Sequence, residues 1–403
     1  MNTDRLPGEY WSFLFARLFF VLGLRMITTI VIYQMFHLAN TYMVGIAGLS
    51  EFVPAVIAAI YSGHYIDSHN KKNILVISYI FYLLCGVSLA IISLTSVQFS
   101  VNFKITAILG IVFCTGIIRS FAGPAANSMI AAIVPRPMLP KAISLNSSTW
   151  LVSSIMGHAT GGLLIAFAGI SNAYFATAAL IAIAGVFALQ LKPKPPVKKQ
   201  LEEPMLKAIG QGFSFVFNNK NLLGVISLDL FAVLFGGAVA FIPEVAEKVL
   251  HTGPIGYGFL NAAMDMGSLV SIAILLWLPM KQKQGLKMML AVAGFGLFII
   301  VFGLSQVYWL SFFALAAAGF FDGISVVVRG TIAQLNTPDE LRGRVASINL
   351  IFINSSNELG QFESGITSRM FGTIPAIIVG GVMSVLIVGA TWLKFPKLEK
   401  LEY

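Results

Sequence analysis

Residues 135–146 read PRPMLPKAISLN, and residues 338–349 read PDELRGRVASIN. The two segments lie 203 residues apart in a chain of 403, which is close to half of its length. The corresponding positions are Pro135 with Pro338, Lys141 with Arg344, Ser144 with Ser347, and Asn146 with Asn349. Each segment falls between the fourth and fifth apolar stretch of its half. We therefore expect two halves that arose by duplication.

The composition excludes most soluble proteins. Hydrophobic residues make up 57% of the chain and charged residues 11%, whereas a soluble domain carries about 25% charged residues. The mean hydropathy is +0.85. Neither an ordinary cytosolic enzyme nor a disordered protein fits these values. Cys85 and Cys114 both stand in apolar runs, so no disulfide framework or cysteine-rich metal motif is expected.

A helix that spans a membrane needs roughly 20 apolar residues. Breaks at Pro, Gly, Asn and charge clusters leave twelve candidate spans. They are 12–37, 41–66, 73–95, 104–133, 142–167, 171–191, 222–246, 256–279, 287–305, 308–335, 345–370 and 373–394. The first span is too long for a cleaved signal peptide and contains two arginines, so it is expected to remain in the protein.

Lysine and arginine in short loops indicate the orientation. With the N-terminus in the cytoplasm, the inner segments hold 19 basic residues and the outer segments only Lys104, Lys248 and Arg369. We therefore expect a multi-pass protein of the cell (inner) membrane with both termini in the cytoplasm. The net charge of +9 is mostly this topology signal, so no nucleic-acid partner is expected.

The halves are joined by 192–204, KPKPPVKKQLEEP, which is charged and rich in proline. The following segment has apolar residues at helical spacing and predicts an amphipathic helix on the inner membrane surface; the alternative is a connector with no role in transport. The predicted domains are an N-terminal six-helix bundle over 1–191, a cytoplasmic linker with this helix over 192–221, and a C-terminal six-helix bundle over 222–403.

Two six-helix halves, a central linker and cytoplasmic termini resemble the major facilitator superfamily. The loop after the second span, GHYIDSHNKK over 63–72, is similar to the motif of that superfamily at this place, although Ser68 stands where a basic residue usually follows the Asp. The resemblance implies an all-α membrane fold of 12 transmembrane helices in two pseudo-symmetric bundles. It also implies that the motif holds the cytoplasmic side closed through Arg344 or the start of the eleventh span; the alternative is a solvated turn. The gating residues are then Gly63, Asp67, Lys71, Lys72 and Arg344.

A narrower resemblance is to the enterobactin-exporter and macrolide-efflux branch. The similar segments are GIAGL at 45–49, FVPA at 52–55, RSFAGP at 119–124, AISLN at 142–146 and TPDELRGRV at 337–345. This resemblance implies export driven by an inward proton gradient, with a siderophore or a drug-like amphiphile as substrate. That branch often has an Asp after a Gly in the first span. Here Leu24 follows Gly23, so the first span offers no acid for a proton.

Ionisable residues inside spans are costly, so they face a cavity or a partner. Arg119 and Asp322 are separated by the 203-residue repeat offset, and both lie near the membrane midplane. They can pair with each other or with substrate, the alternative being a structural pair between the halves. Arg25 is also near the midplane. It favours substrate contact over a structural pair with Glu51, and its guanidinium suits an anionic ligand.

The eleventh span carries polar residues at the i, i+3, i+4, i+7 spacing of one helical face. They are Asn354, Asn357, Glu358 and Gln361. Such a stripe borders water or bonds a neighbouring helix. The predicted substrate-binding residues are Arg25, Arg119, Asp322, Asn354, Glu358 and Gln361. The predicted proton-coupling residues are Asp229 and Asp322, followed by Glu51. His158 is expected to be a packing residue.

These patterns predict a secondary active transporter that works by alternating access, an antiporter exporting a small amphipathic or anionic molecule such as a siderophore. The alternatives are a drug or macrolide efflux pump, for which the 32 phenylalanines are suited, an importer of the same fold, and a membrane receptor or scaffold. No phosphate-binding glycine loop and no nucleophile–base pair is seen, so we expect no enzyme activity, cofactor or metal. The expected partners are the small-molecule substrate, protons and the lipid bilayer, with the protein as a monomer.

Overall fold

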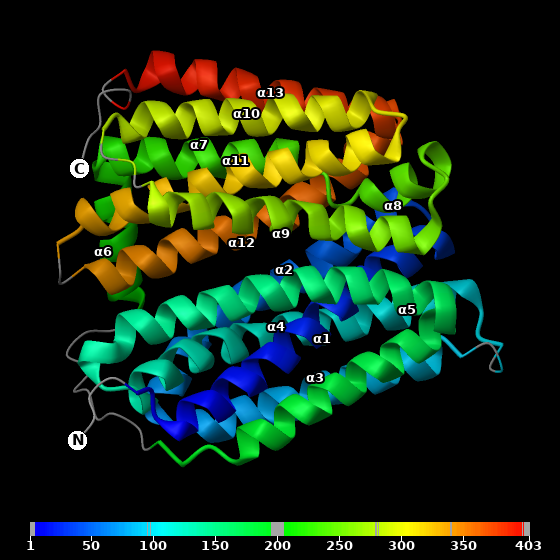
Figure 1. Cartoon of the computed structure of the whole chain (residues 1–403), viewed down its shortest axis with the longest axis horizontal. Helices are drawn as coiled ribbons and strands as arrows, with labels where there is room; N and C mark the ends of the chain where they lie inside the picture. Colours follow the sequence, from blue (N-terminus) through cyan, green and yellow to red (C-terminus); the bar gives the residue numbers. More distant parts are fainter. Residues whose placement is uncertain are drawn as a thin grey trace. The chain divides into compact units, whose positions relative to one another are not determined.

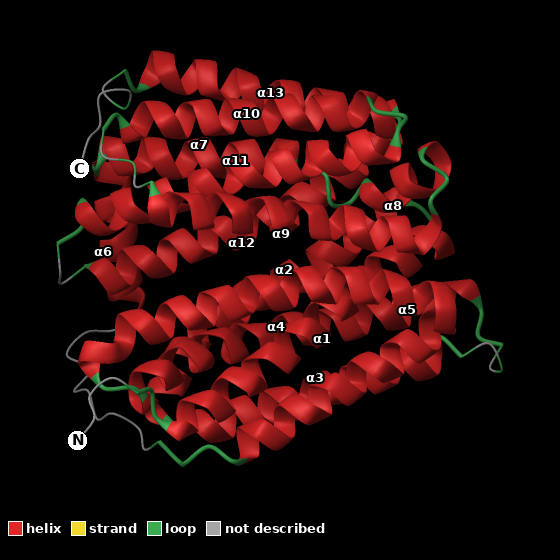
Figure 2. Cartoon of the chain, viewed as in Figure 1, coloured by secondary structure: helices red, strands yellow, loops and turns green. Residues whose placement is uncertain are grey.

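The computed structural model describes residues 5–94, 96, 98–194, 205–278, 280, 282–338, 341–396 and 398. Every regular element in these ranges is a helix, and the long helices are labelled in Figure 1 and coloured red in Figure 2. In the first half they are α1 (Gly8–Leu38), α2 (Thr41–Ser68), α3 (Lys71–Ile92), α4 (Val101–Ile133) and α5 (Leu139–Leu189). The second half contains α6 (Met205–Asn218), α7 (Lys220–Gly236), the short α8 (Ile242–Glu244), α9 (Gly253–Trp277), α10 (Gln284–Leu304), α11 (Tyr308–Leu335), α12 (Arg342–Phe371) and α13 (Thr373–Lys394).

The described helices match the predicted spans. Nine of them are long and apolar enough to cross a membrane, or ten if the bent pair of α6 and α7 is one span. The helix α5 is in fact two helices, because Gly169 has a φ of 81° and interrupts it. With α5 divided, and α7 and the more polar α12 included, the described helices correspond to the twelve predicted spans. The all-α fold is therefore confirmed.

Capping side chains explain where several helices begin. The Asn70 side chain accepts a hydrogen bond from the Lys72 amide at the start of α3, and Ser100 accepts one from Phe103 at the start of α4. Asn219 does the same for Leu222 at the start of α7. Each cap satisfies an amide that lacks a partner within its own helix.

The predicted span 222–246 is wrong at its outer end. The helix α7 ends at Gly236, where two consecutive glycines remove helix propensity. The short α8 then begins at Ile242, with Pro243 in its first turn, and a single π-helical turn, Val245–Val249, follows it. A window of hydropathy could not detect this break, because the residues on both sides of it are apolar.

The described chain divides into two compact units, which share two helices. Unit 1 is Met1–Ala39, Ser50–Gln200 and Gly253–Ala262; unit 2 is Asn40–Leu49, Leu201–Thr252 and Ala263–Tyr403. The first turns of α2 thus belong to unit 2, and the first turns of α9 belong to unit 1. This sharing is absent from the predicted domains, in which every helix belongs to a single bundle.

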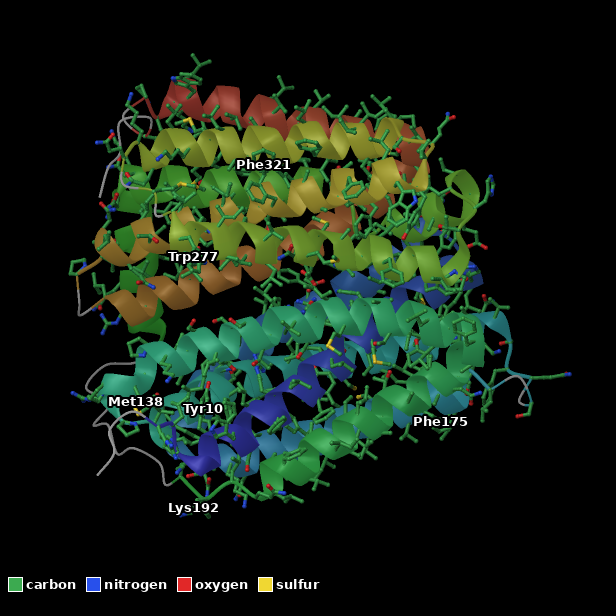
Figure 3. All side chains as sticks on the ribbon, in the orientation of Figure 1. Tyr10, Met138, Phe175, Lys192, Trp277 and Phe321 are labelled. Carbon is green, nitrogen blue, oxygen red and sulfur yellow. The ribbon has the colours of Figure 1, made fainter. Side chains whose placement is uncertain are left out.

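Within unit 1, α1 packs chiefly on α5, and α3 packs on both α4 and α5. The Phe20 ring of α1 stacks on Tyr79 of α3 with 4.2 Å between centroids. At one end of this unit, Tyr10 and Met138 lie close together in Figure 3. There the Tyr10 hydroxyl donates a 2.6 Å hydrogen bond to the Ala142 carbonyl, which fixes the start of α1 against the start of α5.

Within unit 2, α10 lies between α11 and α13, as Figure 1 shows, and α7 packs on α12 and α13. An apolar core joins α7, α10, α11 and α13. Its buried members are Val225, Leu228, Ala232, Met288, Met289, Val292, Val328, Ile332, Val388 and Leu398. This core holds in place the helices that carry the acidic residues described below.

The predicted amphipathic helix is present as α6, and part of it packs on α12. Val216 of α6 is fully buried in a cluster with Val345 and Ile348 of α12. Gly212 packs against the side chains of Ile348 and Arg344. The second half of α6 therefore rests on protein, because α12 presents an apolar surface to it; its contact with a membrane surface remains a prediction only for the exposed Phe217.

Candidate functional site

The intramembrane charges gather in two places, one in each unit. In unit 1, the Arg119 Nη1 of α4 lies 3.0 Å from the Glu51 Oε1 of α2. The side chains are 37% and 18% exposed, so this ion pair is only partly removed from solvent. The helices approach closely here, since a Cβ on Gly116 would lie 2.1 Å from the Glu51 carbonyl oxygen.

This geometry changes the pairing expected from the repeat. Arg119 takes a partner from its own unit, Glu51, so its charge is balanced within unit 1. For Arg25, the alternative to substrate contact is a structural pair with Glu51 or another carboxylate, and the Glu51 carboxylate is paired here with Arg119. Both expectations rested on depth in the membrane, and depth does not specify which direction a side chain faces.

Arg25 lies against an aromatic side chain. Its guanidinium carbon is 4.6 Å from the centre of the Trp150 ring of α5. Contacts of this kind contribute about 0.5–2 kcal/mol. The backbone of α5 comes close to the same arginine, because a Cβ on Gly157 would lie 2.7 Å from the Arg25 Cβ. Arg25 and Trp150 thus form one half-buried surface that is both cationic and aromatic.

In unit 2, Asp229 of α7 forms an ion pair with Arg329 of α11. Ser325, one turn before Arg329, donates a 2.8 Å hydrogen bond to the Asp229 Oδ1. Asp229 is 4% exposed and Arg329 is 3% exposed. No basic residue is near Asp229 in the sequence, and α11 brings Arg329 to it from 100 residues away.

Asp322 lies beside this pair without belonging to it. Asp229, Asp322 and Ser325 line a cavity of about 10 Å³, together with the ring of Phe321, whose position in unit 2 is labelled in Figure 3. That volume is about enough for one water molecule. Asp265 of α9 interacts electrostatically with Asp322. Within the described ranges, no ion-pair partner is recorded for Asp322.

The polar stripe of α12 is divided between core and surface. Glu358 is 7% exposed and accepts a 3.4 Å hydrogen bond from the Gln361 Nε2, whereas Asn357 is exposed. Gln361 lies against Gly48 of α2, where a Cβ would meet its side chain at 3.2 Å. The Asn354 side chain lies outside the described part of the structure.

The residues of the predicted gate contact their own units. Lys72 Nζ donates a 2.7 Å hydrogen bond to the Leu189 carbonyl in unit 1, and Lys71 is buried. Arg344 donates a hydrogen bond to Gln211 of α6 in unit 2. Asp67 is exposed at the end of α2, and Gly63 is half-buried in the same helix. A contact of Asp67 with Arg344 stays a prediction.

Sequence reasoning missed several members of these clusters. Trp150 is one, and Ser325 is another. For α11 a signal was available, because Asp322, Ser325 and Arg329 follow the i, i+3, i+7 spacing of one helical face. Among the described residues, no group of three or more His, Cys, Asp or Glu is placed to hold a metal ion.

Long apolar helices with buried charges in both units define a multi-span membrane protein of the transporter class. The family model described as "Transmembrane secretion effector" matches residues 26–403. The chain therefore belongs to this family of the major facilitator superfamily, within the enterobactin-exporter branch that the sequence motifs indicated.

Named relatives and solved structures agree with this assignment. The chain is 25% identical over 310 residues to the enterobactin exporter EntS of Shigella flexneri, covering 76% of this chain and 72% of that protein. It is 24% identical over 352 residues to EntS of Citrobacter koseri, covering 86% and 82%. The fold is similar to that of a D-xylose–proton symporter, with a TM-score of 0.76, 13% identity and coverage of 98% and 99%. It is also similar to the nucleoside transporter NupG, with a TM-score of 0.75, 15% identity and coverage of 96% and 99%.

Proposed function

We propose that this transporter exports a small anionic or amphipathic molecule, such as a siderophore, in exchange for protons. The observation that carries the proposal is the contact of the Arg25 guanidinium with the Trp150 ring in unit 1. A guanidinium suits carboxylate or phenolate groups, and an indole ring gives a flat apolar surface for an aromatic or alkyl portion of the ligand. The names of the relatives, which are enterobactin exporters, support the choice of substrate.

The substrate would be held by residues of both halves. Arg25 and Arg119 are proposed to bind its anionic groups, with Glu51 releasing Arg119 when the ligand arrives. The Arg119–Glu51 ion pair is partly exposed, and such pairs contribute little stability. An anionic ligand can therefore replace Glu51 as the partner of Arg119 at little cost. On the other half, Asp322 and the α12 residues Asn354, Glu358 and Gln361 are proposed to bind polar groups of the substrate.

For proton coupling, the contacts favour Asp322 over Asp229 and Glu51. Asp229 has Arg329 as its counter-ion, and Glu51 has Arg119, so each of these carboxylates already has a basic partner. Asp322 instead lies near a second carboxylate, Asp265. Two neighbouring carboxylates repel one another, and one bound proton relieves the repulsion. Asp322 is therefore the proposed proton carrier.

We further propose that transport proceeds by alternating access between the bundles 1–191 and 222–403, with the linker 192–221 between them. Gly63, Asp67, Lys71, Lys72 and Arg344 would close the cytoplasmic side. The protein would lie in the cell membrane with both termini in the cytoplasm, as a monomer. The basic residues of the short loops support this orientation.

The test is transport by purified protein in liposomes under an imposed pH gradient. Wild type should concentrate an anionic siderophore against its gradient. The variant Asp322→Asn should lose the accumulation of substrate that the pH gradient drives. It should still exchange unlabelled for labelled substrate. Asp265→Asn is the matched control and should change only the pH dependence. If Asp322→Asn concentrates substrate as wild type does, this residue does not carry the proton.

The substrate class is tested by binding. Arg25→Ala should weaken the binding of anionic ligands by about 1.5–3 kcal/mol, the loss of a charge-assisted hydrogen bond, and leave neutral ligands nearly unaffected. Equal losses for both classes would favour the rival proposal of a drug efflux pump, for which charge is not needed. Accumulation driven inward under the same gradient would favour an importer.

A further inference from the structure

A buried histidine joins three helices of unit 1. His158 of α5 is 8% exposed, and its Nδ1 lies 2.7 Å from the Thr29 Oγ1 of α1. The Thr29 carbonyl accepts a 3.0 Å hydrogen bond from the hydroxyl of Tyr257, which is fully buried in the first turns of α9. Thr29 thus binds α5 through its side chain and α9 through its backbone.

The hydrogen bonds of Thr29 assign the tautomer of His158. The Thr29 hydroxyl has a single proton, and it donates this proton to the Arg25 carbonyl at 2.9 Å. Its oxygen can then only accept from the imidazole, so Nδ1 carries the hydrogen of the neutral ring. Nε2 is the basic nitrogen, and it is the atom that gains a proton when the ring becomes charged.

The backbones of α5 and α9 are in close contact beside this ring. A Cβ on Gly258 would lie 2.8 Å from the His158 carbonyl oxygen and 2.8 Å from the Gly162 Cα. A Cβ on Gly162 would in turn lie 2.5 Å from the Pro254 carbonyl oxygen. The backbones of α5 and α9 are too close here for either helix to shift alone. A rearrangement around His158 must therefore move the first turns of α9.

A second charge in this cluster is costly. Two other charged or titratable residues have recorded contacts with Thr29 of this cluster: Arg25 of α1 and Tyr257 of α9. The ring centroid of Tyr33, also in α1, lies 5.4 Å from that of Tyr257. The Arg25 guanidinium lies over Trp150, eight residues before His158, which is roughly 12 Å along a helix. An imidazolium at position 158 would add a second positive charge at low dielectric, where charges interact strongly.

We propose that His158 is a proton-binding site, and that its protonation weakens the attachment of the first turns of α9 to α1 and α5. Histidine changes its charge between about pH 5 and 8, so this site responds to the pH difference across a cell membrane. The neutral ring suits the buried site, and the charged ring is relieved when the junction opens to water. The residues of α9 from Ala263 onward belong to unit 2, so opening at the first turns passes along one helix into the other unit.

The use of this site in transport rests on the proposed proton coupling, whereas the proton site itself does not. It therefore offers a second titrating group in unit 1, separate from the acidic cluster of unit 2. The sequence predicts only packing for His158, because a single histidine has no recognisable spacing to a partner.

The test measures titration and opening directly in the full-length protein in lipid nanodiscs, without substrate. Histidine-selective isotope labelling gives five imidazole signals, and the signal lost in His158→Gln belongs to His158. That signal should titrate between pH 8 and 5. Over the same range, amide protection factors of residues 253–262 should fall about two- to tenfold, because the charged ring favours the open junction; the size of the change is that of one hydrogen bond, although the Nδ1–H bond to Thr29 is itself kept. Protection factors are used because they remove the intrinsic pH dependence of amide exchange.

Two variants distinguish the effect of protonating His158 from the effect of losing the hydrogen bond between α9 and Thr29. Glutamine at position 158 can donate to Thr29 but does not titrate, so His158→Gln should abolish the pH dependence and keep the protection found at pH 8. Tyr257→Phe removes the bond from α9 to Thr29, so it should lower protection at every pH and keep the pH dependence. If His158→Gln does not fold, His158→Asn takes its place.

A His158 signal that stays constant from pH 8 to 5, or the same pH dependence of protection in His158→Gln as in wild type, would overturn the proposal. Liposome transport distinguishes this failure from failure of the proposed function. If a pH gradient drives no transport while His158 titrates and controls α9, the proton coupling is wrong and the site stands. If transport is pH-driven and unchanged in His158→Gln, the site has no part in transport.

Discussion

Each unit contains an ion pair between two of its long helices, and the two pairs differ in their exposure. Arg119 of unit 1 and Asp322 of unit 2 are separated by the repeat offset, and Arg25 and Asp229 lie in corresponding helices. In unit 1 the arginine is paired with Glu51 in a partly exposed place. In unit 2 the aspartate Asp229 is paired with Arg329 in a buried one.

The difference indicates a division of roles. A buried ion pair supported by a hydrogen bond from Ser325 fixes α7 to α11, and breaking it is costly because one charge remains buried. A partly exposed pair is easily exchanged for another partner, such as an anionic ligand. We therefore expect unit 2 to lose stability when its pair is broken, and unit 1 to lose function while its stability is nearly unchanged.

The largest change in stability is expected when the ion pair of unit 2, Asp229 with Arg329, is broken. Arg329→Met leaves Asp229 charged and buried, which should lower the free energy of unfolding by about 3–5 kcal/mol. The double variant Arg329→Met, Asp229→Leu removes both charges and should recover most of this loss. Thermal unfolding in one detergent measures all three proteins. A double variant no more stable than the single one would contradict the role of the ion pair.

A second, smaller loss of stability is expected from the close contact between Gly116 and the Glu51 carbonyl oxygen in unit 1. Gly116→Ala places a Cβ against the Glu51 carbonyl oxygen and should cost about 1–3 kcal/mol, as overpacking does. Gly123→Ala in the same helix is the control, since nothing lies within 4 Å of its Cβ. The control should be neutral or stabilise by about 0.5–1 kcal/mol. Similar losses in both variants would point to the backbone instead of to this contact.

A third substitution tests whether the ion pair of unit 1 contributes less stability than that of unit 2. Glu51→Gln removes the charge that balances Arg119, and because the pair is partly exposed the loss should stay below about 1 kcal/mol. The same variant should tighten the binding of anionic ligands, since Arg119 no longer has a competing carboxylate. Unfolding and ligand titration on one preparation measure both. A loss of stability as large as that of Arg329→Met would remove the distinction between the two units.

The smallest effect concerns Glu244 of α8, outside the membrane-spanning helices of unit 2. Burial alone would raise its pKa, but hydrogen bonds from Thr41, Thr373 and Lys248 outweigh burial and lower the pKa below its ordinary value. A lowered carboxylate pKa contributes stability at higher pH and loses it as the pH falls through the folded-state value.

The stability difference between wild type and Glu244→Gln should therefore be constant from pH 8 to 5. It should decline only below the ordinary glutamate pKa of about 4.3. Unfolding midpoints at stepped pH values measure it. A difference that already changes between pH 7 and 6 would show that another group titrates at this contact.

Much of the fold follows from the sequence because helix formation in a membrane depends on local composition. The spans 308–335 and 373–394 agree with α11 and α13 at both ends. The break after Gly236 was missed, since hydropathy continues across it. For the site, the sequence identified the charged residues but not their contacts: Asp229 and Arg329 stand 100 residues apart, and their ion pair is seen only in the structure.

The sequence by itself determined the membrane class, the all-helical fold and the family, because hydropathy and motifs are properties of neighbouring residues along the chain. Only the tertiary structure decided which charges meet and how the two units share α2 and α9. It also brought His158, Thr29 and Tyr257 together from three helices. The physical reason is that each side chain's partner depends on the rotation and packing of its helix against others. Those quantities arise from close contacts between small residues, such as Gly162 and Gly258, that lie far apart in the sequence.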